Sequence, residues 1–64
     1  MNILKKTMKI QSVTQAEISR KMGVTKQAVN NWTRGISLPS PKYMKKLSDY
    51  LKVSIDKLFF NDEQ

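Results

Sequence analysis

The sequence contains no cysteine and no histidine among its 64 residues. Without cysteine, the chain cannot form a disulfide, bind a metal through thiolates or use a cysteine nucleophile. The absence of histidine removes the side chain that most often serves as a general base and as a metal ligand. Only five carboxylates remain, and two of them stand in the last four residues. We therefore expect no catalytic residue, no metal site and no cofactor, and we do not expect an enzyme.

Acidic residues are also scarce relative to basic ones. Twelve Lys and Arg residues stand against five Asp and Glu residues, which gives a net charge of +7 and a pI near 10.0. Such a surplus favours a polyanionic partner, because Lys and Arg displace the counterions that condense on phosphates. A solvated basic surface would have the same composition, so the charge alone leaves both interpretations open.

Long apolar runs are missing as well. No segment approaches the roughly 18 apolar residues of a membrane span, and the N-terminal lysines are not followed by the apolar stretch of a signal peptide. We expect a cytoplasmic protein that has neither a membrane partner nor a small-molecule substrate. A chain of this length forms one small domain. We expect that domain over residues 1–60, with a short polar and acidic tail over 61–64.

One local pattern occurs three times and predicts three helix starts. Val13-Thr14, Val24-Thr25 and Val53-Ser54 each place a hydroxyl residue after a valine. The hydroxyl can accept a hydrogen bond from a free amide of the first turn. The valine can pack against an apolar residue four positions after the hydroxyl, as a hydrophobic staple. The apolar partners are Ile18, Val29 and Leu58. Three such starts predict an all-helical protein.

The other helix boundaries follow from polar caps and proline. Asn2 can cap a first helix that ends near Gln11. Ser40-Pro41 is typical of a helix start, because proline at the first helical position lacks only an amide that would have no helical partner. This fourth helix is expected to run to about Leu51, and a fifth is expected over residues 55–60. The pattern predicts a compact five-helix fold of the all-α class.

The second and third predicted helices are short and joined by a tight turn. Thr14 and Glu17 have the spacing of a capping box, in which hydroxyl and carboxylate each accept from the other residue's amide. Gly23 ends the second helix and Gly35 the third, since glycine tolerates positive φ. Ser19 is small enough to let the two helices approach closely. These features predict a helix-turn-helix.

The third helix is predicted to have a buried side and a polar side. At about 100° per residue, Val29 and Trp32 fall on the buried side. The opposite side has no carboxylate and carries Lys26, Gln27, Asn30, Asn31 and Arg34. Amide side chains can bond bidentately to adenine in the major groove, and Lys can reach guanine acceptors. An acid-free amide face favours DNA binding, whereas a polar face that is merely solvated is the alternative.

Residues 3–60 resemble the lambda-repressor-like helix-turn-helix family, the five-helix domain of phage Cro and repressor proteins and their bacterial relatives. The matching residues are Thr14-Gln15, Gly23-Val24-Thr25, the buried Val29 and Trp32, Arg34-Gly35 and the segment from Leu51 to Phe59. The resemblance implies a sequence-specific transcriptional regulator that binds double-stranded operator DNA, as a small repressor or Cro-like protein does. Its place would be the cytoplasm of a bacterium, with the gene carried by the host or by a phage.

The resemblance also implies roles for individual residues. Base contacts in the major groove are expected from Lys26, Gln27 and Asn31. Contacts to the DNA backbone are expected from Gln15, Asn30, Arg34, Lys42 and Tyr43. In the family, the counterpart of Gln15 binds a phosphate and buttresses the amide that matches Gln27. Ser19 stands where the family usually has alanine, and it is tolerated if its hydroxyl bonds a backbone carbonyl.

A two-fold symmetric operator requires two recognition helices about 34 Å apart, and the family dimerises through surface near the last helix. Phe60 is the candidate contact, because it falls off the apolar stripe of that helix, and Tyr50 and Lys57 could flank it. Alternatively, Phe60 folds back on the first helix as part of the core. We expect a weak homodimer or a dimer that forms on DNA.

Two other classes of function stay open. The first is an antitoxin-like or partner-binding module that uses the Phe59-Phe60 end on a protein. The second is a non-specific architectural DNA binder, against which the amide-rich face of the third helix argues.

Overall fold

Five helices account for most of residues 3–60, the part of the chain that the computed structural model describes. They are α1 (Leu4–Gln11), α2 (Gln15–Met22), α3 (Lys26–Thr33), α4 (Pro41–Leu51) and α5 (Ile55–Phe59). The all-α class and the order of the helices are confirmed. The expected cap Asn2 and the tail 61–64 lie outside the described residues, and Ile3 occupies the N-cap position of α1.

Three helix starts are capped as their sequence pattern predicts. The Thr14 hydroxyl oxygen accepts from the Glu17 amide at 3.1 Å, and the Thr25 oxygen accepts from the Ala28 amide at 3.0 Å. The Ser54 oxygen accepts from the amide three residues later at 3.3 Å. Ser40 does occupy the N-cap position of α4, but its side chain makes no capping hydrogen bond. The side-chain cap predicted there is therefore wrong.

The second half of the predicted capping box is also wrong. The Glu17 carboxylate accepts a hydrogen bond from the Tyr50 hydroxyl of α4. Among the described residues, no hydrogen bond runs from the Thr14 amide to that carboxylate. A phenol that the fold brings alongside α2 is a competing donor that local spacing cannot reveal. Glu17 therefore ties α2 to α4 instead of closing its own helix start.

The turn between α2 and α3 forms as expected. Gly23 has φ of +72° and donates its amide to the Ser19 carbonyl at 2.9 Å. The Ser19 hydroxyl donates to the Val24 carbonyl, which confirms the condition under which a serine is tolerated at this helix contact. The turn is thus fixed by backbone and side-chain hydrogen bonds that are local in sequence.

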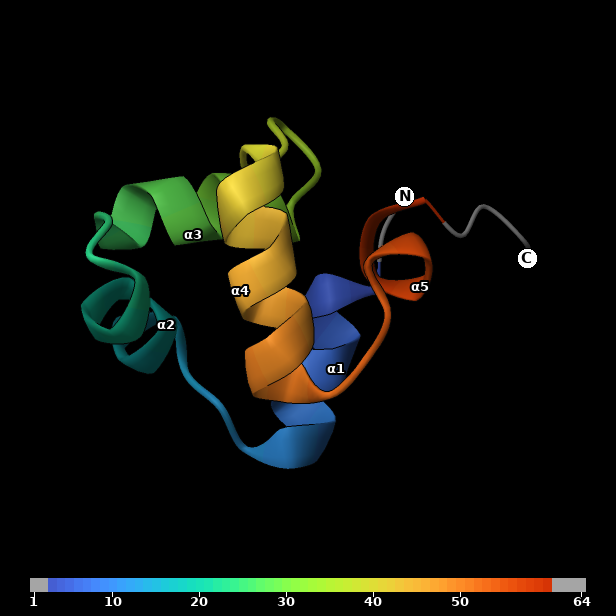
Figure 1. The fold of residues 1–64 in the computed structure, drawn as a ribbon. Helices are drawn as coiled ribbons and strands as arrows, with labels where there is room; N and C mark the ends of the chain where they lie inside the picture. The colour runs from blue at the N-terminus through green and yellow to red at the C-terminus, as the bar shows by residue number, and fades with distance from the viewer. Residues whose placement is uncertain (1–2, 61–64) are drawn as a thin grey trace.

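One apolar core joins all five helices, and α4 crosses the front of the molecule in Figure 1, with α2 and α3 on one side, α5 on the other and α1 behind it. Every helix contributes buried side chains to it, namely Leu4, Met8, Ile18, Met22, Val29, Trp32, Met44, Leu47, Leu51, Leu58 and Phe59. The core places α3 at the edge of the molecule with one face uncovered.

Candidate nucleic-acid interface

The outer face of α3 is set by the burial of its inner face. Val29 is fully buried and Trp32 is 5 % exposed, so the helix cannot rotate about its axis without exposing the core. Lys26 and Gln27 are exposed on the opposite side, and Asn31 is half-buried beside them. These last three residues, predicted to contact bases, lie together and are called the reading surface below.

Two amide pairs order this face. Gln27 donates from Nε2 to Oδ1 of Asn31 at 3.0 Å, one turn along the same helix. Gln15, from the first turn of α2, donates from Nε2 to Oδ1 of Asn30 at 3.2 Å. The expected buttress from Gln15 to Gln27 is therefore not formed in this structure, because each amide is paired with a different neighbour. These hydrogen bonds already order the side chains in the free protein, so a smaller entropic cost is left for the binding step.

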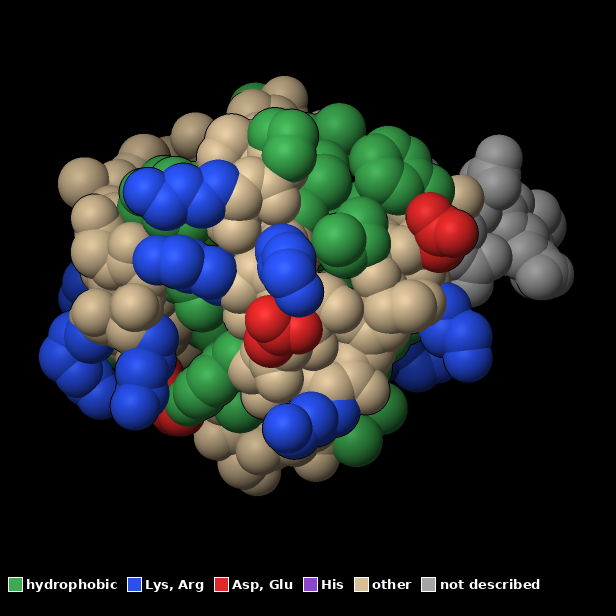
Figure 2. Space-filling model, in the orientation of Figure 1, with side chains coloured by type: hydrophobic (Ala, Val, Ile, Leu, Met, Phe, Trp, Pro, Cys, Tyr) green, Lys and Arg blue, Asp and Glu red, His purple; other side chains and the backbone are tan. Residues whose placement is uncertain are grey.

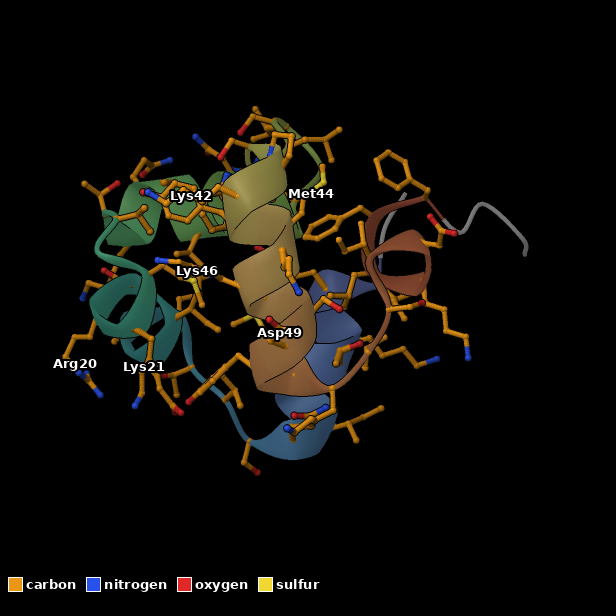
Figure 3. The ribbon with its side chains drawn as sticks, in the orientation of Figure 1. Arg20, Lys21, Lys42, Met44, Lys46 and Asp49 are labelled. Atoms are coloured by element: carbon orange, nitrogen blue, oxygen red, sulfur yellow. The ribbon has the colours of Figure 1, made fainter. Side chains whose placement is uncertain are left out.

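The start of α4 lies against α3 through two aromatic rings. The ring of Tyr43 packs on that of Trp32, with centroids 6.0 Å apart and planes inclined by 33°. The ammonium of Lys42 lies 5.6 Å from the Tyr43 centroid, and Figure 3 shows this lysine extending from α4 toward α3. The two residues predicted to contact the DNA backbone on α4 are thus adjacent to α3. Arg34 is exposed at the C-cap of α3.

Positive charge on this side is not offset by nearby carboxylates. Within residues 3–60, the one ion pair joins Lys45 and Asp49 at 3.4 Å, and both side chains are largely exposed. An exposed pair of this kind contributes little to stability. Lys26, Arg34 and Lys42 take part in no ion pair of the described chain, so their charge is available to an anionic partner.

The predicted dimer contacts do not lie together. Tyr50 bonds Glu17 on α2, whereas Phe60 follows α5 on the other side of α4 (Figure 1). Phe60 is 54 % exposed, so the alternative in which it joins the core does not hold. Lys57 is exposed on α5. Tyr50 is therefore placed away from the end of the molecule at which Phe60 lies.

Three exposed large apolar residues were not predicted from the sequence, and the most exposed of them is Ile10 on α1, at 72 %. Ile36 and Leu38, in the loop between α3 and α4, are 59 % and 51 % exposed. Figure 2 shows apolar side chains gathered on the visible face between the start of α4 and α5. In the sequence, Ile36 and Leu38 are two positions apart and belong to no helical apolar stripe, and this spacing indicates that they are not held in a helix facing the core. We refer to the exposed apolar residues of the α3–α4 loop and of the end of α5, Ile36, Leu38 and Phe60, as the apolar patch.

This arrangement of two capped helices around a glycine turn, with an acid-free outer face, defines a helix-turn-helix DNA-binding domain. A family model described as helix-turn-helix matches residues 4–58. The chain therefore belongs to the XRE-type helix-turn-helix family, whose members resemble lambda repressor and Cro and are DNA-binding regulators. The comparison with curated proteins gave no significant match. No helix within residues 3–60 has the length and apolar character needed to cross a membrane.

Proposed function

We propose that this regulator is a small, Cro-like repressor that occupies an operator as a homodimer, with α3 in the major groove. The observation that carries the proposal is the reading surface, an exposed lysine beside a hydrogen-bonded pair of amides on a helix whose inner face is buried in the core. It would act in the bacterial cytoplasm without a cofactor or small-molecule substrate.

The chemistry of the reading surface suits base edges. An amide presents a donor and an acceptor in one plane and can pair bidentately with adenine, while Lys can donate to the acceptors of guanine. Because the Gln27 and Asn31 side chains already bond each other, the two amides would meet the groove as one unit. Lys26, at the first position of α3, would add a donor next to them.

Phosphate contacts would hold this unit in register. Gln15 stands at the first helical position of α2, where free amides and the positive end of the helix dipole attract an anion. Asn30, which Gln15 holds, borders the reading surface. Arg34 and Lys42 would supply charge to the backbone, and the Tyr43 hydroxyl would supply a donor.

The second copy would dock on the apolar patch, with Lys57 at its edge. Monomeric proteins seldom leave such side chains together in water without use. Exposed Asp56 and Lys57 are neighbours on α5 and take part in no ion pair of the described chain. In an isologous contact the same surface of both copies meets. Asp56 of one copy can therefore face Lys57 of the other, and the reverse. This charge pattern favours a second copy as the partner.

Selection of bound duplexes from a random pool, followed by a Gln27→Ala variant, tests the base-reading role. Loss of the amide should weaken binding to the selected site by about 1–3 kcal/mol and relax the preference at one base pair. Lys42→Gln is the matched comparison, because it should weaken binding to every sequence equally and lower the salt slope by about 0.9. If Gln27→Ala weakens scrambled DNA as much as the selected site, base reading is excluded, and equal wild-type affinity for both indicates an architectural binder.

The same selection tests the dimer. Selected sites should contain two symmetric half-sites about one helical turn apart. Phe60→Lys should weaken binding to the whole site while leaving binding to an isolated half-site unchanged. A single unpaired half-site, together with no effect of Phe60→Lys, would contradict the dimer and leave the exposed end of α5 to a different protein partner.

A further inference from the structure

A second group of basic residues lies on α2 and α4, and of its four members the proposed function uses only Lys42. Arg20 and Lys21 extend from α2, while Lys42 and Lys46 extend from α4 on the same side of the molecule (Figure 3). All four side chains are exposed. Figure 2 shows Lys and Arg side chains along this side, over α2 and α4. We refer to these four residues as the basic strip.

Two tyrosine rings attract the three lysines of the basic strip. The ammonium groups of Lys42 and Lys46 lie 5.6 and 5.8 Å from the centroid of Tyr43. The ammonium of Lys21 lies 5.9 Å from the centroid of Tyr50. A cation within about 6 Å of a ring face is attracted by the ring quadrupole without being neutralised. The rings therefore give the lysines a preferred place and leave their charge in full.

Carboxylates offset this charge only in part. Glu17 borders the strip and keeps its negative charge while it accepts the hydroxyl of Tyr50. It forms no ion pair with the strip among the described residues, and one carboxylate leaves most of the charge of four cations in place. Asp49 pairs with Lys45 instead, and Figure 3 shows Asp49 on the front of α4, apart from the lysines that extend toward α2. The strip thus presents cations whose counterions come from solution, which is the condition for gaining affinity by counterion release.

The spacing of the strip suits a phosphate backbone. Lys42 and Lys46 are four residues apart on one helix, which separates them by about 6 Å along its axis. A DNA strand carries a phosphate every 3.4 Å or so along the duplex axis, so both lysines can contact one strand. Protein–protein interfaces, in contrast, are depleted in lysine. A nucleic-acid backbone is therefore favoured over an acidic protein surface.

We propose that the basic strip binds backbone phosphates of the duplex that flanks the base pairs contacted by α3. Lys42 stands at the junction, because it lies beside α3 and also begins the strip. The inference rests on the proposed function, in which α3 enters the major groove. It extends that function, because the flanking duplex would then add to the affinity without adding to the sequence preference, which comes from the base pairs contacted by α3.

Lys46→Gln tests the strip, and Lys45→Gln is its matched control. The two positions are adjacent on α4 and lose the same charge, but only Lys46 belongs to the strip. Binding is measured against salt on a mixed-sequence duplex of about three helical turns. We expect Lys46→Gln to lower the salt slope by about 0.9. Lys21→Gln should behave in the same way, whereas Lys45→Gln should leave the slope unchanged.

Each outcome bears on the strip separately from base reading, because mixed-sequence DNA requires no sequence preference. Equal effects of Lys46→Gln and Lys45→Gln on the salt slope would overturn the inference. So would loss of binding to a poly-glutamate peptide in Lys46→Gln with duplex binding intact, since the strip would then serve an acidic protein. Thermal unfolding followed by circular dichroism confirms that each variant is folded.

Discussion

The two connections that flank α3 are built in opposite ways. The turn before α3 is three residues long, is closed by the Ser19 hydroxyl and leads into a helix start capped by Thr25. The loop after α3 is longer, exposes Ile36 and Leu38, and leads into a helix start without a side-chain cap at Ser40. The first connection is held by polar bonds between near neighbours, whereas the helix that follows the second is held by its packing against the core.

This difference matches the different proposed tasks of the two ends of α3. A surface that reads bases has to keep its side chains within hydrogen-bond tolerance, and a tight turn with local bonds meets that need. A surface that meets a second copy needs apolar area, which the longer loop supplies. The comparison therefore predicts that substitutions before and after α3 differ in kind as well as in size.

The largest expected effect concerns the packing that holds α4. Leu47 is fully buried in the middle of that helix. Leu47→Ala should lower the free energy of unfolding by about 2–5 kcal/mol, because it removes buried methyl groups and leaves a cavity. Urea unfolding followed by circular dichroism and by Trp32 fluorescence measures the loss. Lys45→Ala, exposed on the same helix, is the control and should cost only a few tenths of a kcal/mol. A similar cost for both would refute the dependence of α4 on packing.

A smaller effect distinguishes the two helix starts directly. Thr25→Ala removes an oxygen that accepts the Ala28 amide and should cost about 1 kcal/mol of unfolding free energy. Ser40→Ala removes a side chain that makes no capping bond, so its cost should stay within a few tenths. Thermal or urea unfolding of both variants under one condition gives the comparison. Equal costs would show that Ser40 caps α4 in solution and would remove the contrast between the two connections.

The smallest effect is a titration rather than a loss of fold. The hydrogen bond to Glu17, together with desolvation and the negative charge of that carboxylate, raises the pKa of Tyr50 above its ordinary value of 10.0. The raised pKa stabilises the fold fully below pH 10.0, and this contribution is lost as the pH rises through the higher folded-state pKa. Glu17→Gln should lower the pKa of Tyr50 toward its ordinary value. Phenolate absorbance in a Tyr43→Phe background reports the titration of Tyr50 alone. If Glu17→Gln leaves the titration midpoint of Tyr50 unchanged, Glu17 does not raise that pKa.

Local sequence patterns predicted the helices well because caps, glycine turns and apolar periods act within a few residues. Thr14, Thr25 and Ser54 cap as expected, and Gly23 adopts positive φ. The same patterns were wrong where a distant partner competes. Glu17 bonds Tyr50, which lies 33 positions away in the sequence, and no local spacing contains that information.

The candidate site divides in the same manner. The helical period separates the inner side of α3 from its outer side, so the outer position of Lys26, Gln27 and Asn31 follows from the sequence. Their role as base contacts is implied by the family resemblance and stays a prediction. The partner of Gln15 did not follow, because an amide at the start of α2 can reach either Gln27 or Asn30, and only the relative placement of the two helices selects Asn30. The separation of Tyr50 from the apolar patch likewise depends on how α4 lies between α2 and α5.

The sequence by itself determined that the chain is all-helical, where most of its helices begin and end, and which face of α3 stays outside the core. These properties depend on bonds within one turn of helix and on the separation of apolar from polar side chains. Only the tertiary structure decided which amides pair, that Ile36 and Leu38 join Phe60 as exposed apolar residues, and that lysines from α2 and α4 share one side. Those features depend on distances between residues far apart in the chain, which are fixed only when the five helices close around a common core.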